Sequence, residues 1–488
     1  MRQLTGQDDN FLELETLGLP QHFTSVTIFD QSTAPGGLVR FKRILSLLES
    51  RLHLSPLFRS KLLSAPLDLD RPYLVDDHDF DLEYHVRHIA LPQPGDWRQL
   101  CILIARINAR PLDLARPLWE LYVIEGLDKI PDVPPGSFAL MMKLHHCVMD
   151  GVSAAEMMAA IHDLSPEPRA VAPEAPRSVE MPPHPLELTA WAVMNALRKP
   201  GRLVALGRRI LGAERAKKRM DERTRGRAAE RRVLTRFNDR KISPHRVVDA
   251  VSFDFAELRA IKDALPGATI NDVMLAIVSG ALRRFLEQFD ELPTESLTCG
   301  CPIDVRERGE RGKGGNVIGF MGVDLRTDLV DDGERFRAIH AAALEAKADA
   351  QASDVRIPME LMELIPGGIM TLAVRVTAAF GINQTPFNTM LTNVPGPPVQ
   401  LYFAGARSVE GFGIGPLVPG VGLFHTASSA VIGRQGRMLL GFHACREMMP
   451  RPDIYRSCLI ESHCALRDAM LRGDGRPDRP DARAGARA

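Results

Sequence analysis

Alternating apolar and polar stretches predict short strands separated by helices. The apolar run Phe138–Met142 follows Pro134-Pro135-Gly136, a sequence typical of a turn, and this predicts a buried strand. Thr24–Phe29 and Leu121–Ile124 predict two further strands. Apolar residues recur at helical spacing between Phe41 and Leu52, which predicts a helix. The first part of the chain is therefore expected to alternate between strands and helices.

Three more patterns predict elements in other parts of the chain. Phe80–Val86 alternates between apolar and polar residues and predicts a half-buried strand, whereas Leu186–Leu197 predicts a helix. Thr269 precedes Asp272 by three residues at the start of an apolar stripe, which predicts a capped helix start. Asp272 is therefore expected to support a helix terminus.

Composition excludes several classes of protein. The 488 residues exceed one ordinary hydrophobic core, so two domains and their connections are expected. Hydrophobic residues at 45% and charged residues at 25% are ordinary for a globular protein. Sixty-one basic and 61 acidic residues give no formal net charge, and hence no signal for a nucleic-acid partner. The seven scattered cysteines favour a reducing cytoplasm.

We expect neither an export signal nor a membrane-spanning helix. The first nine residues are mostly polar and lack the apolar core of a signal peptide. The chain also contains no run of eighteen apolar residues. Any contact with a membrane is therefore expected to be peripheral.

The segment Lys143–Gly151 carries the candidate chemistry. His145 and His146 follow the strand predicted at Phe138–Met142, and the end of the segment leads into another helix. Ser153 and Glu156 are spaced as a capping box, which predicts that this helix begins at Ser153. The two histidines are therefore expected to lie between rigid elements, where one of them can face a cavity.

Three interpretations of these histidines compete. They could be core or turn histidines that bind backbone atoms, or they could belong to a metal site with His146 and Asp150 as ligands. The spacing does not put two histidines on one helical face, and no Cys/His cluster supplies a third ligand. The third interpretation is a general base, because a neutral imidazole accepts a proton from a hydroxyl near pH 7.

A family resemblance favours the third interpretation. The sequence His145-His146-x-x-x-Asp150-Gly151 resembles the motif of the CoA-dependent acyltransferase and condensation-domain superfamily. The whole chain from about Phe11 to Asp453 resembles the bacterial wax ester synthase/diacylglycerol acyltransferases more specifically. The shared motifs occur in the same order: Leu57-Phe58-Arg59, the Phe80–His88 stretch, Pro117-Leu118-Trp119, the histidine motif, Asn271-Asp272 and Asn393-Val394-Pro395-Gly396-Pro397.

The resemblance implies roles for individual residues. In that family the second histidine is the base, which implies that His146 takes the proton of the acceptor alcohol. His145 and Asp150 are the other expected catalytic residues and would orient the loop. Substrate-binding residues are expected at Gly151, Asn271 and Asn393. Structural roles are expected for Pro117, Leu118, Trp119, Asp272 and Arg306, with Arg306 as the partner of Asp150.

The resemblance also implies the fold. It is an α/β fold of two chloramphenicol-acetyltransferase-like domains, joined by a helical linker, with an active-site tunnel at their interface. The expected limits are 1–165 for the first domain, 166–246 for the linker, 247–470 for the second domain and 471–488 for a disordered tail. The linker is basic from Arg198 to Arg246, which fits a solvated helix, attraction of CoA phosphates or attraction of anionic lipid headgroups.

The implied reaction moves a long-chain acyl group from acyl-CoA to diacylglycerol or a long-chain alcohol, without a cofactor or metal. We expect a cytoplasmic enzyme, peripherally associated with the inner membrane face or with lipid inclusions, and no nucleic-acid partner. Two alternatives stay open. One is a condensation-type acyltransferase with another donor or acceptor, and the other is a non-catalytic lipid-binding protein, which would not explain the histidine motif.

Overall fold

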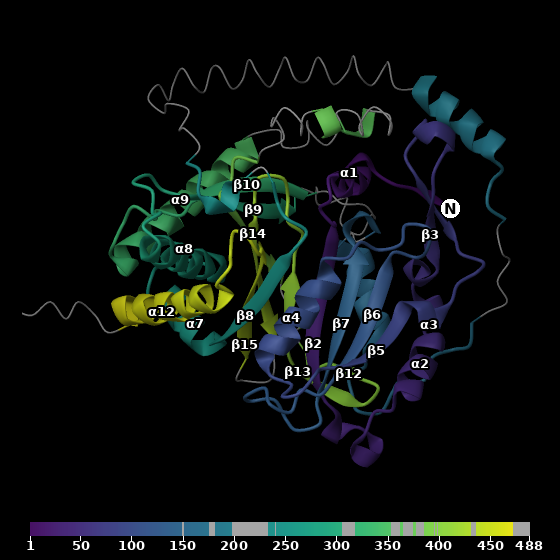
Figure 1. The fold of residues 1–488 in the computed structure, drawn as a ribbon, viewed down its shortest axis with the longest axis horizontal. Coiled ribbons are helices and arrows are strands. Elements are labelled where there is room, and N and C mark those ends of the chain that lie inside the picture. Colours follow the sequence, from purple (N-terminus) through teal and green to yellow (C-terminus); the bar gives the residue numbers. More distant parts are fainter. Residues whose placement is uncertain are drawn as a thin grey trace, which may run out of the picture.

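A computed structural model describes most of the chain. The described residues are 1–148, 151–174, 181–197, 233–239, 241–304, 318–352, 362–364, 374–376, 385–394, 396–397, 399–430 and 436–471. Two six-stranded sheets lie side by side in them, with helices around both (Figure 1). His145 and His146 of the candidate site are among the described residues, at the end of a strand of the first sheet.

The first sheet contains the strand that leads to the histidine motif. Its strand order is β12-β13-β2-β7-β6-β5, so β7 is a central strand, antiparallel to both of its neighbours. Every residue of β7 is buried, which explains the apolar run from Phe138 to Met142. The strands are β2 (His22–Asp30), β5 (Val86–Ala90), β6 (Trp119–Glu125), β7 (Phe138–His145), β12 (Tyr402–Phe403) and β13 (Ala406–Ile414).

The second sheet belongs to the later part of the chain, and a small third sheet lies near the N-terminus. The second has the order β10-β9-β11-β14-β15-β8, and the third has the order β1-β4-β3. The strands of the second are β8 (Arg246–Asp254), β9 (Thr298–Asp304), β10 (Ile318–Asp324), β11 (Thr389–Val394), β14 (Leu423–Ala430) and β15 (Arg437–Cys445). Those of the third are β1 (Arg2–Gln3), β3 (Ser60–Leu63) and β4 (Tyr73–Asp76).

Helices cover the outer sides of the sheets. In Figure 1, α7, α8, α9 and α12 gather beside the second sheet, whereas α2 and α3 lie beyond the first. The helices are α1 (Gly6–Glu15), α2 (Phe41–Glu49), α3 (Leu82–His85), α4 (Trp97–Asn108), α5 (Gly151–Ile161), α7 (Phe255–Asp263), α8 (Ile270–Gln288), α9 (Asp332–Ala352) and α12 (Pro452–Leu471). A further helix covers residues 185–197 and is called the edge helix below. Among the described helices, none combines the length and apolar character that crossing a bilayer requires.

The two sheets share a hydrophobic core with α4 between them. Side chains of β2, α4, β8, β13 and β15 form one apolar cluster, which includes Val26, Ile104, Val248, Phe412 and Leu439. The strands β12 and β13 come from residues 402–414 but pair into the first sheet, where β13 is antiparallel to β2. Late residues thus return to the first sheet, and the expected domain limits stay predictions.

Most of the predicted elements are confirmed, whereas one predicted element type and one predicted boundary are wrong. The strands predicted at Thr24–Phe29, Leu121–Ile124 and Phe138–Met142 lie within β2, β6 and β7. The expected strand at Phe80–Val86 is instead the short helix α3 followed by β5, because the Asp81 side chain accepts a hydrogen bond from the backbone N–H of Glu83. The helix predicted to begin at Ser153 already begins at Gly151.

Candidate active site

The two histidines of the motif lie where β7 ends. His145 is the last residue of β7, and its backbone N–H donates to the carbonyl of Leu118 at 3.0 Å. The backbone N–H of His146 donates to the carbonyl of Gln21 at 2.8 Å, at the start of β2. Gln21 is fully buried and its amide donates to Leu417, so this strand end is tied to the later part of the chain. The histidine backbones are thus fixed from both neighbouring strands.

The helix α1 contacts both imidazole rings. Phe11 and Glu15 lie four residues apart on α1 and therefore project from the same face of the helix. The ring of Phe11 stacks on the ring of His146, with 4.2 Å between the ring centroids and 27° between the planes. The carboxylate of Glu15 lies 2.9 Å from Nε2 of His145. One helical turn of α1 therefore supports both histidines.

The hydrogen bonds of His145 use both ring nitrogens. Its Nδ1 accepts from the backbone N–H of Cys147 at 3.1 Å, so the ring proton is on Nε2 and is donated to Glu15. The side chain is fully buried. His145 is therefore held in one orientation and tautomer, which suits support of the neighbouring residue. His146, in contrast, is half-buried.

The N-terminus of α1 is also held in place by hydrogen bonds. Thr5 and Asp8 form a reciprocal capping box, and the backbone N–H of Gly6 donates to the Glu363 carboxylate at 2.5 Å. Arg71 donates to the other oxygen of that carboxylate. A Cβ at Gly6 would lie 2.6 Å from the backbone carbon of Met362, which explains why glycine stands there. The later part of the chain thus helps to hold α1 against the histidines.

Burial sets the protonation states at this site. Burial, together with a smaller effect of the neighbouring His145, lowers the pKa of His146 to about 4, so the imidazole is neutral near pH 7. For Glu15, burial would raise the pKa, but hydrogen bonds from His145 and His22 outweigh it and lower the pKa to about 2. Burial also lowers the pKa of His22 to about 4. His22 and His146 are thus neutral near pH 7, in the neighbourhood of the Glu15 carboxylate.

The same residues could in principle offer metal ligands. Ligand atoms of Glu15, His22 and His145 all lie within 4.8 Å of one another. The contacts among them also form a hydrogen-bonded cluster, because Glu15 accepts from His145 and lies 3.5 Å from Nε2 of His22. The expectation that the enzyme needs no metal stays a prediction.

The Pro117-Leu118-Trp119 motif is buried next to the strand end. Its three residues are all buried, and Trp119 begins β6. The indole Nε1 of Trp119 donates to the carbonyl of Phe58 at 2.9 Å, and His85 lies 2.7 Å from the carbonyl of Trp119. These contacts join the motif to Leu57-Phe58-Arg59 and support the neighbouring β7. They are the kind of contacts that a structural role requires.

The predicted residues of the second half lie on its sheet and helices. Asn271 is partly buried in the first turn of α8, and Asn393 is exposed near the end of β11. Within the described residues neither amide hydrogen-bonds to His145 or His146, and their substrate-binding role stays a prediction. Asp272 forms a reciprocal capping box with Thr269, as the sequence pattern predicted, and its carboxylate lies 3.0 Å from Nδ1 of His340.

Several predicted features lie outside the described residues. They include Asp150, its expected partner Arg306 and the basic stretch 198–232. Gly151 is the first residue of α5. The catalytic role of Asp150, the pairing with Arg306 and the function of the linker therefore stay predictions.

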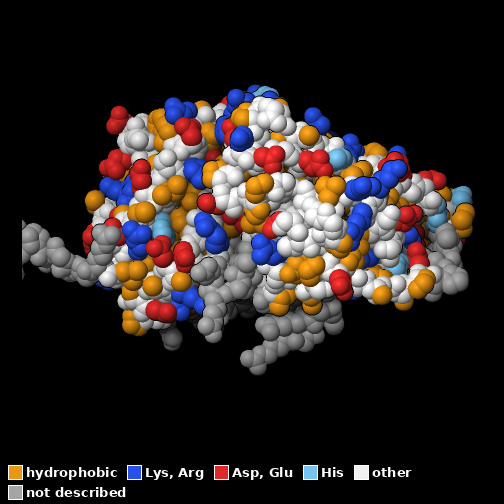
Figure 2. Space-filling view, turned by 90° about the horizontal axis from the view of Figure 1, so that it is seen from below, with side chains coloured by type: hydrophobic (Ala, Val, Ile, Leu, Met, Phe, Trp, Pro, Cys, Tyr) orange, Lys and Arg blue, Asp and Glu red, His pale blue; other side chains and the backbone are white. Residues whose placement is uncertain are grey.

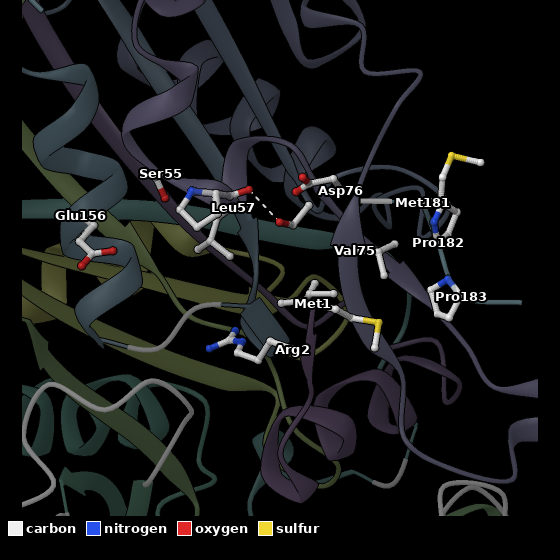
Figure 3. A pocket seen from close by; sticks show the side chains of 13 residues that line it. Met1, Arg2, Ser55, Leu57, Val75, Asp76, Glu156, Met181, Pro182 and Pro183 are labelled. Atoms are coloured by element: carbon white, nitrogen blue, oxygen red, sulfur yellow. Dashed lines mark hydrogen bonds between the residues drawn. The ribbon is translucent and has the colours of Figure 1, made fainter. Parts of the chain in front are cut away.

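A pocket of about 500 Å³ opens beside α5 and the small third sheet (Figure 3). Met1, Arg2 of β1, Val75 and Asp76 of β4, and Glu156 of α5 contribute to its walls. Met181, Pro182 and Pro183 close its other side, immediately before the edge helix. Neither histidine of the motif lines this pocket, so the expected tunnel at the domain interface stays a prediction.

Comparisons with known proteins agree with this architecture. Residues 4–274 match the family described as wax ester synthase/diacylglycerol acyltransferase catalytic domain, and residues 314–466 match the WS/DGAT C-terminal domain. A provisionally named diacylglycerol O-acyltransferase of Mycobacterium tuberculosis is 33% identical over 452 residues, which are 92% of this chain and 87% of the relative. A second one from that organism is 34% identical over 441 residues, 88% of this chain and 90% of the relative.

Solved structures show the same fold. A wax ester synthase/diacylglycerol acyltransferase from Marinobacter aquaeolei VT8 superposes with a TM-score of 0.66 at 24% identity, covering 96% of this chain and all of that one. The starter condensation domain of rhizomide synthetase, solved as a mutant with C8-CoA, gives a TM-score of 0.55 at 14% identity, over 96% of this chain and 95% of that one. The fold is thus that of acyltransferases with two chloramphenicol-acetyltransferase-like domains.

The fold and the histidine motif are those of an acyltransferase, and the protein is an enzyme of this class. The chain belongs to the wax ester synthase/diacylglycerol acyltransferase family.

Proposed function

We propose that this enzyme transfers a long-chain acyl group from acyl-CoA to the free hydroxyl of diacylglycerol, with a long-chain alcohol as the other acceptor. The names of the Mycobacterium relatives support diacylglycerol, and that of the Marinobacter structure supports both acceptors. No cofactor beyond the acyl-CoA substrate enters the reaction. Because the proposed substrates are amphiphilic, the reaction takes place at the surface of a membrane or a lipid inclusion.

In the proposed reaction His146 takes the proton of the acceptor hydroxyl as the hydroxyl oxygen attacks the thioester carbonyl carbon. The carbon–sulfur bond of the resulting tetrahedral intermediate then breaks, and the protonated His146 returns its proton to the departing CoA thiolate. The new ester and free CoA are the products, and the histidine ends in its neutral form. No covalent acyl-enzyme is required, and the neighbouring Cys147 is fully buried with its pKa raised by burial.

The observation that carries this proposal is the different environment of the two histidines. His145 uses both ring nitrogens in hydrogen bonds to Glu15 and Cys147. His146 stacks on Phe11, and burial keeps it neutral, with its pKa lowered to about 4. A neutral, oriented imidazole is the form that a general base needs before the reaction begins. His145 is then a positioning residue, acting through the backbone that it shares with His146.

The test is an assay of purified enzyme with radiolabelled palmitoyl-CoA. Diacylglycerol and hexadecanol are supplied in separate reactions, and the lipid products are separated from free palmitate. We expect labelled triacylglycerol with the first acceptor and labelled wax ester with the second. Release of free palmitate alone, or retention of all label in palmitoyl-CoA with both acceptors, would contradict the proposed function.

A further inference from the structure

The outward face of the edge helix, residues 185–197, is lined by apolar side chains, with the exposed Glu187 at its border. Side chains that recur at positions i, i+4, i+7, i+8 and i+11 lie on one side of a helix. Leu186, Val193, Met194 and Leu197 on this side are 74%, 51%, 50% and 73% exposed. Ala190 lies among them and is exposed as well. A run of large apolar side chains this exposed is unusual unless a partner covers it.

The opposite side of the edge helix fixes its orientation. Leu188 and Ala192 are buried, and Leu188 packs with Ala65, Tyr73 and Val75 in a small apolar cluster. The amide of Asn195 donates to the carboxylate of Asp70 at 2.7 Å, on the same docked side. The apolar face therefore points outward because the other face is already packed and hydrogen-bonded.

Two further exposed leucines follow Ala65, a residue that packs in the same cluster as Leu188. Leu67 is 90% exposed and has a φ of 57°, a left-handed conformation that is costly for leucine. Leu69, two residues on, is 44% exposed. Trp191 packs at an angle on Tyr73 yet remains 38% exposed, at the flank of the apolar face. An indole at the border between apolar and polar surroundings is typical of lipid interfaces.

The charge of the sequence that follows the edge helix favours a lipid surface as the partner that covers the apolar face. The sequence that directly follows the edge helix, residues 198–232, contains fourteen Lys and Arg against four Asp and Glu. An apolar helix face joined to basic sequence has the composition of an interfacial membrane element, because basic side chains attract anionic headgroups while apolar ones enter the acyl region. The face of the molecule seen in Figure 2, opposite the edge helix, instead shows basic, acidic and apolar side chains interspersed.

We propose that the edge helix, together with Leu67 and Leu69, inserts into the surface of a membrane and docks the enzyme there. The choice of a lipid over a protein partner rests on the proposed function, whose acceptors are lipids. Figure 1 shows the edge helix at the margin of the molecule, beside the small third sheet. The pocket of Figure 3 opens next to its N-terminal end, lined by Met181, Pro182 and Pro183. Docking would thus bring this pocket to the lipid.

The test measures sedimentation of the full-length enzyme with sucrose-loaded vesicles of phosphatidylcholine and phosphatidylglycerol in equal parts. The variant carries Leu186→Gln and Leu197→Gln, since glutamine keeps helix propensity while removing apolar area. We expect its vesicle partitioning to fall about tenfold or more, and the fall to persist at high salt, because apolar insertion is not screened. A matched control carries Val330→Gln and Leu344→Gln, which are 73% and 56% exposed elsewhere, and should bind vesicles like the wild type.

Three results would overturn the proposal. One is wild-type partitioning of the Leu186→Gln, Leu197→Gln variant, and another is an equal loss in the control variant. The third is a wild-type dimer in sedimentation velocity that the variant alone dissociates, with vesicle binding unchanged, which would assign the face to a second copy of the chain. Acyl transfer to a detergent-solubilised acceptor is measured in parallel. Activity retained by the edge-helix variant supports docking, whereas activity absent from the wild type is a failure of the proposed function.

Discussion

Phe11 and Glu15 lie one turn apart on α1, and each contacts one of the two adjacent histidines at the end of β7. The aromatic ring reduces the solvent contact of His146, whereas the carboxylate fixes the tautomer of His145. A single rigid helix face therefore sets both the protonation state and the orientation of the motif. This relationship leads to separate predictions for the two α1 residues.

Glu15→Ala should lower kcat about 100-fold, because loss of orientation on the scale of an ångström has an effect of that size. The substitution removes the Glu15 carboxylate oxygen that accepts the hydrogen bond from Nε2–H of His145 at 2.9 Å. Glu15→Gln keeps an acceptor oxygen without the charge and should recover most of the activity. Steady-state kinetics of both variants distinguish positioning from bulk stability. If the two are equally active at the wild-type rate, the carboxylate does not position the motif.

Phe11→Ala should raise the pKa of His146 from about 4 toward its ordinary value, because burial is the main cause of the lowered pKa. The acidic limb of the profile of kcat/KM against pH should then move to higher pH. Phe11→Leu, which keeps most of the apolar contact, serves as the control and should shift the limb less. An unchanged limb in Phe11→Ala would show that the ring does not control the protonation of His146.

A buried ion pair holds the helix that follows the motif. Arg51 donates to both carboxylate oxygens of Asp163 at 2.7 and 2.9 Å and also to backbone carbonyls at the end of α5. Arg51→Ala leaves the buried Asp163 carboxylate with only the half-exposed Arg169, whose backbone N–H lies 3.1 Å and whose Nε lies 3.9 Å away, and should lower the free energy of unfolding by about 3–5 kcal/mol. Arg451→Ala removes an exposed pair with Asp453 and should leave the urea midpoint unchanged. Equal midpoints for the two variants would refute the role of the buried pair.

Stability should fall as the pH falls from about 6.5 to 4. Burial lowers the pKa of His22, His162 and His425 to about 4 and that of His443 to about 3, all from 6.5. Below pH 6.5 the unfolded chain therefore binds protons that the folded chain does not, at a cost on the order of 3 kcal/mol per histidine. Asp9 opposes this, because burial raises its pKa to about 7. Asp9→Asn should thus steepen the decline.

Urea unfolding at about pH 7.5, 6 and 5 measures this dependence. The wild-type midpoint should drop at each step, and the drop should be larger in Asp9→Asn. A wild-type midpoint that stays level across this range would contradict the buried neutral state of the histidines.

The parts of the fold predicted from the sequence were those with local causes. Thr269 and Asp272 are three residues apart, so their capping box is visible in the sequence and is present in the structure. The apolar run of β7 is equally local. The helix α3 was not predicted, because the hydrogen bond from Glu83 to Asp81 outweighs an alternation of only seven residues.

The missed features depend on contacts between distant residues. Glu15 and His145 are 130 residues apart, and no motif joins them in the sequence. Phe11 lies near the start of the family resemblance, but nothing in the sequence indicates that its ring stacks on His146. The pairing of β13 with β2 brings residues 407–414 into the first sheet, and hydrophobic alternation says nothing of which strand is its neighbour. The support of the motif thus required the structure.

The central claim is that His146 is the general base. The direct measurement is the single-turnover rate of labelled palmitoyl transfer to diacylglycerol by His146→Ala, with the melting temperature recorded for the same preparation. We expect a loss of about 100- to 10,000-fold with the melting temperature maintained, and a smaller loss for His145→Ala. A folded His146→Ala enzyme that transfers palmitate at the wild-type rate would contradict the account.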